Sequence, residues 1–116
     1  MNQPLLLCLV PLLASCATVR EPRAPSPPAY HATGTEPFWS LLIDQEALTF
    51  TLAGSQPVRQ PKPKVIVGIA GELYRTARID VNIVHAACSD GMSDRTYPDK
   101  VQVRVDDHHF SGCGGL

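Results

Sequence analysis

The chain has little imbalance of charge, few aromatic residues and no apolar run long enough to cross a membrane. Its ten lysine and arginine residues nearly match its eleven aspartate and glutamate residues, which leaves a net charge of −1. Proteins that bind nucleic acid usually carry a basic face with interleaved aromatic side chains, and no such stripe occurs here. The composition therefore argues against a nucleic-acid partner.

The common sequence motifs of catalysis are also missing. The sequence contains no Gly-x-Ser-x-Gly elbow, no phosphate-binding P-loop and no dinucleotide-binding fingerprint. A free Cys113 close to His109 would satisfy a Cys–His nucleophile pair on paper, but only if Cys113 is not in a disulfide. We expect a protein that is not an enzyme and that needs no cofactor.

The N-terminus reads as an export signal. Its apolar run "LLLCLVPLL" has nine residues, whereas a transmembrane helix needs about 20, so the run is typical of the central region of a signal peptide. The following "LASC" resembles the lipobox of bacterial lipoproteins. That resemblance implies a signal peptide over residues 1–15, cleavage before Cys16 and lipid acylation of Cys16. Ala17, in place of an aspartate, favours the outer membrane facing the periplasm.

The four cysteines then leave one pair that can form a disulfide within the folded domain. Cys8 leaves with the signal peptide and Cys16 carries lipid, so Cys88 and Cys113 are left. An exported chain folds in an oxidising compartment, where two thiols are expected to pair. We expect a Cys88–Cys113 disulfide.

The rest of the chain divides into a tether and one small domain. Eleven prolines in 116 residues argue against long helices, and residues 16–33 read as a lipid-anchored, proline-rich spacer. Residues 34–116 read as the folded domain. Strands are expected over 37–43, 47–53, 64–70, within 73–88 and over 100–106, from their alternation of apolar and polar residues.

Between these strands, 54–63 and 89–99 read as loops, 106–109 as a turn, and the final residues as a short edge strand. This pattern predicts an all-β domain, a small antiparallel barrel or sandwich of five to eight short strands.

Three further stretches carry a family resemblance: "GTEPFW" from residue 34, "CSDGMSDRTYP" from residue 88 and "GCG" from residue 112. Together they resemble a family of small, largely uncharacterised lipoproteins of the Gram-negative envelope. More distantly, the chain is similar to the β-barrel lysozyme-inhibitor lipoproteins. The resemblance implies location and fold, with no settled activity.

Two groups of residues are candidates for a site. The first is a binding rim formed by the opening motif and the polar loop; its members are Glu36, Phe38, Trp39, Asp90, Met92, Asp94 and Tyr97. The second, a weaker set of metal ligands, consists of His85, His108 and His109. Neighbouring histidines on a strand point to opposite faces, so only one of His108 and His109 could share a site with His85. Both also lie in the turn expected over 106–109, and a solvated turn is therefore the preferred interpretation of this pair.

We therefore predict a monomeric, lipid-anchored binding or structural module of the envelope, whose partner is an unknown envelope protein or small ligand. A lysozyme-inhibitor-like protein and a carrier of a metal or small ligand are the alternatives.

Overall fold

The computed structural model describes residues 28–116, which form β-strands and loops. The strands are β1 (Tyr30–Gly34), β2 (Trp39–Ile43), β3 (Ala47–Leu52), β4 (Val58–Pro61), β5 (Ile66–Val67), β6 (Gly71–Arg75), β7 (Ile79–Val84), β8 (Cys88–Ser89), β9 (Thr96–Tyr97), β10 (Asp99–Val105) and β11 (His108–Gly114). Within this range, no helix is long and apolar enough to cross a membrane. The expected signal peptide, the acylated Cys16 and most of the expected tether lie outside the described residues.

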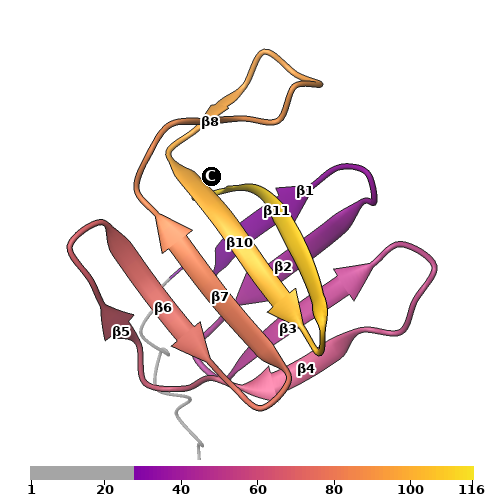
Figure 1. Ribbon diagram of the computed structural model, residues 1–116, viewed down its shortest axis with the longest axis vertical. Coiled ribbons are helices and arrows are strands. Elements are labelled where there is room, and N and C mark those ends of the chain that lie inside the picture. The colour runs from indigo at the N-terminus through magenta and orange to yellow at the C-terminus, as the bar shows by residue number, and fades with distance from the viewer. Residues whose placement is uncertain (1–27) are drawn as a thin grey trace, which may run out of the picture.

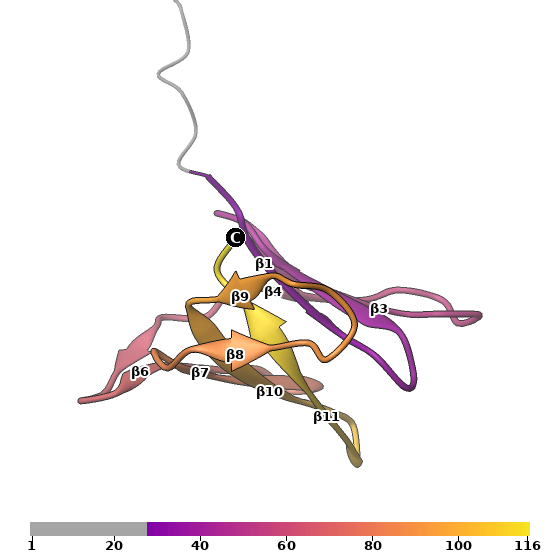
Figure 2. The same ribbon diagram turned by 90° about the horizontal axis from the view of Figure 1, so that it is seen from above.

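Nine of the strands form one antiparallel sheet that curls into a half-barrel, in the order β4-β3-β2-β1-β11-β10-β7-β6-β5 (Figure 1). Seen from above, β1, β3 and β4 lie in one layer and β6, β7 and β10 in the other, with β11 between them (Figure 2). The short β8–β9 hairpin forms a separate two-stranded sheet that projects beyond the end of the half-barrel. The expected all-β class with one disulfide is confirmed, with more strands than the sequence suggested.

The core lies on the concave side of the sheet. Alternation puts every second side chain inside, so Val101, Val103 and Val105 of β10 are buried while Lys100 and Gln102 face outward. The remaining buried apolar side chains come from both layers: Ala32, Trp39, Leu41, Ile43, Leu48, Phe50, Ile79, Val81 and Ile83.

The single tryptophan explains why two glycines stand in the strands around it. Trp39 is 4% exposed, and its ring stacks on Phe50 with the ring centroids 5.7 Å apart. A Cβ on Gly34 would lie 2.0 Å from Nε1 of Trp39, and one on Gly112 would lie 2.8 Å from its Cζ2. Glycine at these inward positions leaves the space that the indole ring fills.

Several expected boundaries differ from the structure. The domain begins earlier than residue 34, because β1 pairs with both β2 and β11. Its inward positions are Tyr30, Ala32 and Gly34, and the two small residues there give almost no hydrophobic alternation to read.

One expected loop and two expected strands also differ from the structure. Residues 54–63 contain β4, a half-exposed edge strand, and the expected strand over 64–70 is reduced to two exposed residues. The last strand is central rather than at the edge, since β11 is paired on both sides. Its serine and glycines form a pattern typical of an irregular chain end. Their close packing against β1 and Trp39 involves residues distant in the sequence, so no local pattern indicates it.

Candidate functional site

The Cys88–Cys113 disulfide, expected from the sequence, is present. Its Cα atoms are 5.6 Å apart and its residues are 25 apart in the sequence. Cys113 is buried in the central strand β11, whereas Cys88 begins the β8–β9 hairpin. The bond therefore fastens a projecting polar loop to the outer face of the sheet.

The loop beyond Cys88 is held by the carboxylate of Asp90. Its Oδ1 accepts the backbone N–H groups of Met92 and Ser93, each at 2.9 Å, and its Oδ2 accepts the Ser93 hydroxyl at 2.9 Å. These hydrogen bonds lower the pKa of Asp90 below its usual range. The largest effect comes from the backbone N–H of Ser93, followed by the backbone N–H of Met92 and the Ser93 hydroxyl. Aspartate and serine side chains therefore cap the backbone of their own loop.

A cavity of about 330 Å³, here called the disulfide cavity, lies between this loop and the sheet. Its floor is the outer face of three strands, with Thr33 of β1, Lys100 and Gln102 of β10, and Ser111 and Cys113 of β11. Its walls include Thr35 from the β1–β2 turn and Cys88, Ser89 and Asp90 from the loop. The lining is thus rich in hydroxyl groups, with one ammonium and one carboxylate.

The candidate rim residues are distributed unevenly around this cavity. Asp90 lines it directly, and Glu36 lies in the turn that begins with Thr35. Phe38 and Met92 are exposed, at 60% and 68%. Trp39 is a core residue at the start of β2, whereas Phe38 precedes it in the β1–β2 turn and is exposed.

The last two rim candidates lie on the loop that carries Asp90. Asp94 is exposed, and Tyr97 is half-buried in β9 opposite Cys88. Neither residue lines the disulfide cavity.

Sequence reasoning missed the residues of the cavity floor. In the sequence, Lys100 and Gln102 fall within the strand expected over 100–106, and Ser111 falls within the edge strand expected at the end of the chain. The usable signal was the disulfide itself, because Cys113 and Ser111 lie on the same face of β11 and pair with Lys100 and Gln102 of β10. A loop fastened at Cys113 must therefore pass over these polar side chains.

A second polar cluster lies at the concave side of the same end of the sheet. The buried carboxylate of Asp99 accepts the Tyr30 hydroxyl at 2.8 Å and lies 2.6 Å from Nδ1 of His85. The other ring nitrogen of His85 lies 2.9 Å from a carboxylate oxygen of Glu72. This row of polar contacts therefore joins three strands, β1, β10 and β6, through the loop residue His85.

Two side chains in this row have shifted pKa values. The hydrogen bonds to Asp99 and then Glu72 raise the pKa of His85, and burial, followed by the hydrogen bond to Asp99, raises the pKa of Tyr30. Both nitrogens of the His85 ring are engaged by carboxylates, so neither is open to act as a general base or metal ligand.

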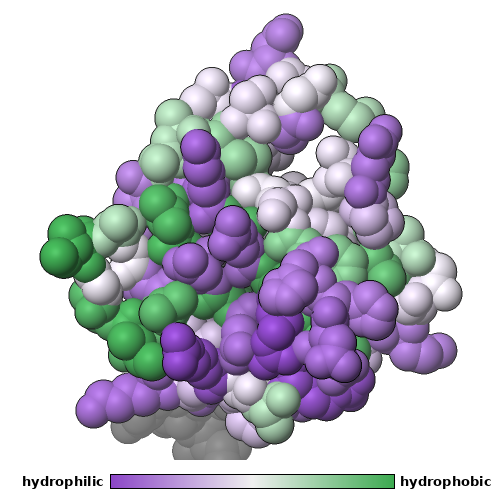
Figure 3. All heavy atoms as spheres, viewed as in Figure 1, coloured by the Kyte–Doolittle hydropathy of each residue, from purple (hydrophilic) through white to green (hydrophobic). Residues whose placement is uncertain are grey.

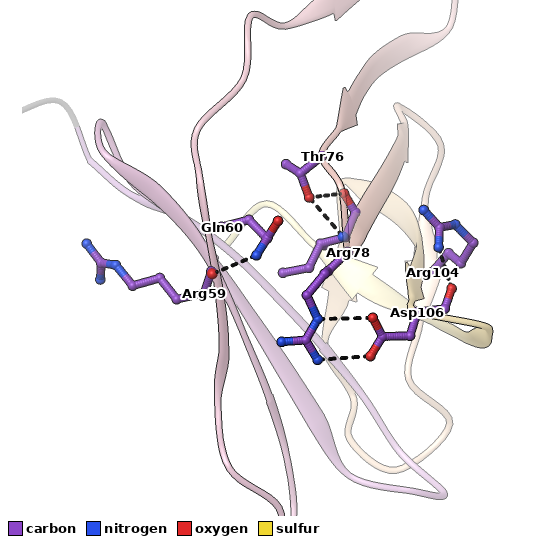
Figure 4. A network of polar contacts seen from close by, with 7 residues as sticks. Arg59, Gln60, Thr76, Arg78, Arg104 and Asp106 are labelled. Atoms are coloured by element: carbon purple, nitrogen blue, oxygen red, sulfur yellow. Dashed lines mark hydrogen bonds and ion pairs between the residues drawn. The ribbon is translucent and has the colours of Figure 1, made fainter.

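The other two histidines lie far from His85 along the strands. His85 follows β7 near Lys100, whereas His108 pairs with Val105 at the opposite end of β10. His109 is next to His108 and faces the outer side. The turn before them is held by Asp106, whose carboxylate accepts two hydrogen bonds from Arg78, at 3.0 and 2.9 Å (Figure 4).

The three histidines are therefore not brought together. Residues 28–116 contain no group of three histidine, cysteine, aspartate or glutamate side chains placed to hold a metal ion.

Comparison with known proteins gave no significant match, whether to a family model, to a curated protein or to a solved structure.

Proposed function

We propose that this chain is a lipid-anchored, non-catalytic binding module of the bacterial envelope and that the disulfide cavity is its ligand site. The observation that carries the proposal is the Cys88–Cys113 bond, which fastens a polar loop over the outer face of the sheet, where the two enclose a cavity. Its volume, about 330 Å³, falls within the ~300–1,000 Å³ typical of small-molecule sites.

The lining indicates the chemistry of the ligand. Hydroxyl groups of Thr33, Ser89 and Ser111 and the amide of Gln102 can donate and accept hydrogen bonds, and the ammonium of Lys100 adds one positive charge. The Asp90 carboxylate is already engaged in shaping the loop. The cavity therefore suits a small polar ligand with hydroxyl or amide groups and a negative charge, such as a sugar acid or a short peptide with a free carboxylate.

The proposed location rests on the N-terminal sequence and gains support from the disulfide. Disulfides persist in oxidising compartments and are rare in the cytosol. The "LASC" sequence supports acylation of Cys16, and Ala17 after it supports attachment to the outer membrane, facing the periplasm. Intact mass of the protein purified from membranes tests this step: a chain starting at Cys16 with added acyl groups is expected, and a Cys16→Ser variant should lack them.

Ligand binding is tested by titration of the isotope-labelled mature chain, followed through its backbone amide resonances. The probes are disaccharide-peptide fragments of peptidoglycan, which carry hydroxyl, amide and carboxylate groups, and neutral N-acetylglucosamine as the uncharged counterpart. Saturable shifts at Ser89, Gln102 and Ser111 are expected with the charged probe.

A matched pair of variants identifies the site. Lys100→Ala should weaken binding of the charged probe, whereas Lys64→Ala, which removes an exposed lysine outside the cavity, should leave it unchanged. Absence of saturable shifts at the cavity with both probes and with a dialysable extract of bacterial envelopes would contradict the proposed site.

A further inference from the structure

The β5–β6 hairpin exposes an unusual amount of aliphatic surface for so small a domain. Val65 and Ile66 are 37% and 48% exposed, Val67 is 75% exposed, and Ile69 at the tip is fully exposed. The space-filling view shows hydrophobic side chains gathered at this end of the molecule (Figure 3). Contiguous exposed apolar side chains of this kind mark an interaction surface.

These side chains point in different directions. Ile66 pairs with Leu73 and Val67 with Glu72, so Ile66 and Val67 lie on opposite faces of the hairpin. Ile69 extends from the tip between them. A protein partner covers one face of a hairpin, whereas a lipid surface surrounds an inserted tip on both faces. Moreover, β5 has only two residues, which offers a very short edge for pairing with another strand.

The hairpin is held firmly in this position. The Gly68 N–H donates to the Gly71 carbonyl at 2.8 Å, and the His85 N–H donates to the Ala70 carbonyl at 2.8 Å. A Cβ on Gly71 would lie 1.7 Å from the Ile83 carbonyl oxygen, so β6 lies tight against β7. The apolar tip is therefore presented by a rigid element rather than by a loose loop.

Cationic residues lie at the base of the hairpin in a pattern that fits anionic headgroups. Lys62 and Lys64 precede the hairpin and Arg75 ends it, whereas the one carboxylate, Glu72, is paired with His85 at 2.9 Å. Cationic side chains next to a membrane surface strengthen its binding when the lipids are anionic.

The chain also enters the domain close to this hairpin. Pro28 and Tyr30 line a small cavity together with Lys62 and Tyr74, the residues at the base of the β5–β6 segment. Residues 17–27 separate Cys16 from the first described residue, and at ~3.3–3.6 Å per residue they reach at most about 40 Å. That reach exceeds the ~30 Å width of a domain of this size, so a lipid at Cys16 allows the hairpin to touch the same bilayer.

We propose that the β5–β6 hairpin inserts its apolar tip into the surface of the bilayer that holds the lipid anchor. This inference rests on the proposed function for the anchor. The tether keeps the hairpin at high effective concentration near the lipid, so weak insertion is sufficient. The domain would then sit on the membrane in one orientation.

The test uses an Ile69→Trp variant of the full chain, purified in its acylated form and reconstituted in phosphatidylethanolamine–phosphatidylglycerol vesicles with or without brominated acyl chains. Because Ile69 is fully exposed, the substitution should leave the fold intact, which circular dichroism checks. The control is Phe38→Trp, at a 60% exposed position in the β1–β2 turn on the opposite side of the molecule from the hairpin (Figure 1).

The expected result is a blue shift and loss of most of the added emission for Ile69→Trp in brominated vesicles, with no loss for Phe38→Trp. Equal responses of the two variants would overturn the proposal. A blue shift that depends on protein concentration and not on lipid would also overturn it and assign the hairpin to a second copy of the chain.

Intact mass of the same preparations separates this outcome from failure of the anchor. If acyl groups are absent, the proposed anchoring fails, and the quenching of Ile69→Trp is then measured with the unacylated chain at excess lipid, where the same contrast with Phe38→Trp is expected.

Discussion

Reduction of the Cys88–Cys113 disulfide should destabilise the domain strongly without removing any atom from its core. The bond links residues 25 apart, and the chain-entropy model gives a contribution of ~3.5 kcal/mol for a loop of this length. A domain of this size has a total stability of about 4–13 kcal/mol. The disulfide therefore supplies a quarter or more of the free energy of unfolding.

The assay is urea unfolding of the same preparation in the presence and absence of reductant, followed by fluorescence of the buried Trp39. With a urea dependence of about 2 kcal/mol per molar, the loss corresponds to a midpoint lower by about 2 M. Reduction itself is confirmed by a mass increase of two hydrogens.

A Cys88→Ala variant is the control, because it cannot form the bond and its midpoint should not respond to reductant. A midpoint for the parent chain that falls by less than ~0.5 M, or about 1 kcal/mol, would refute the reasoning. It would mean that the loop from residue 88 to 113 is already restricted in the unfolded chain or that the bond strains the folded one.

Three further predictions concern the core and the histidine row. Phe50→Ala, at a residue 3% exposed, should cost about 3–5 kcal/mol of unfolding free energy in urea. Gly112→Ala should cost at least ~1–3 kcal/mol in the same assay, because its Cβ would lie 2.0 Å from the Thr33 carbonyl oxygen. His85 has a raised pKa in the folded chain, so its contribution to stability is complete below pH ~6.5 and is lost as pH rises through the folded pKa. NMR titration should place its midpoint above 6.5 and lower it in Asp99→Asn, and a midpoint unchanged by that substitution would contradict the proposed pairing.

The parts of the fold that could be predicted from sequence are those with a strong local pattern. The alternation in β10 and β3 comes from side chains that face a core on one side and solvent on the other, and period-2 spacing reports this directly. The turn before Ala47 is similarly local, since the Asp44 carboxylate accepts the N–H groups of Glu46 and Ala47 at 2.8 Å. The cysteine pair followed from counting thiols.

The weakly patterned strands depended on the tertiary structure. β1 has a glycine at the inward position 34 because the ring of Trp39 fills the adjacent space, and no local signal records that. The glycines of β11 look like a chain end for the same reason, although the strand pairs with β1 and β10 at the centre of the sheet.

By itself, the sequence determined the all-β class, the disulfide and the polar loop after Cys88, because each depends on neighbouring residues or on a count. Only the tertiary structure decided where the curl of the sheet brings distant residues together. It places Lys100, Gln102 and Ser111 beneath the loop that Cys88 fastens, and it separates His85 from His108 by the length of a strand. Contacts between residues far apart in the chain are set by the pairing order of nine strands, and alternation within each strand does not specify that order.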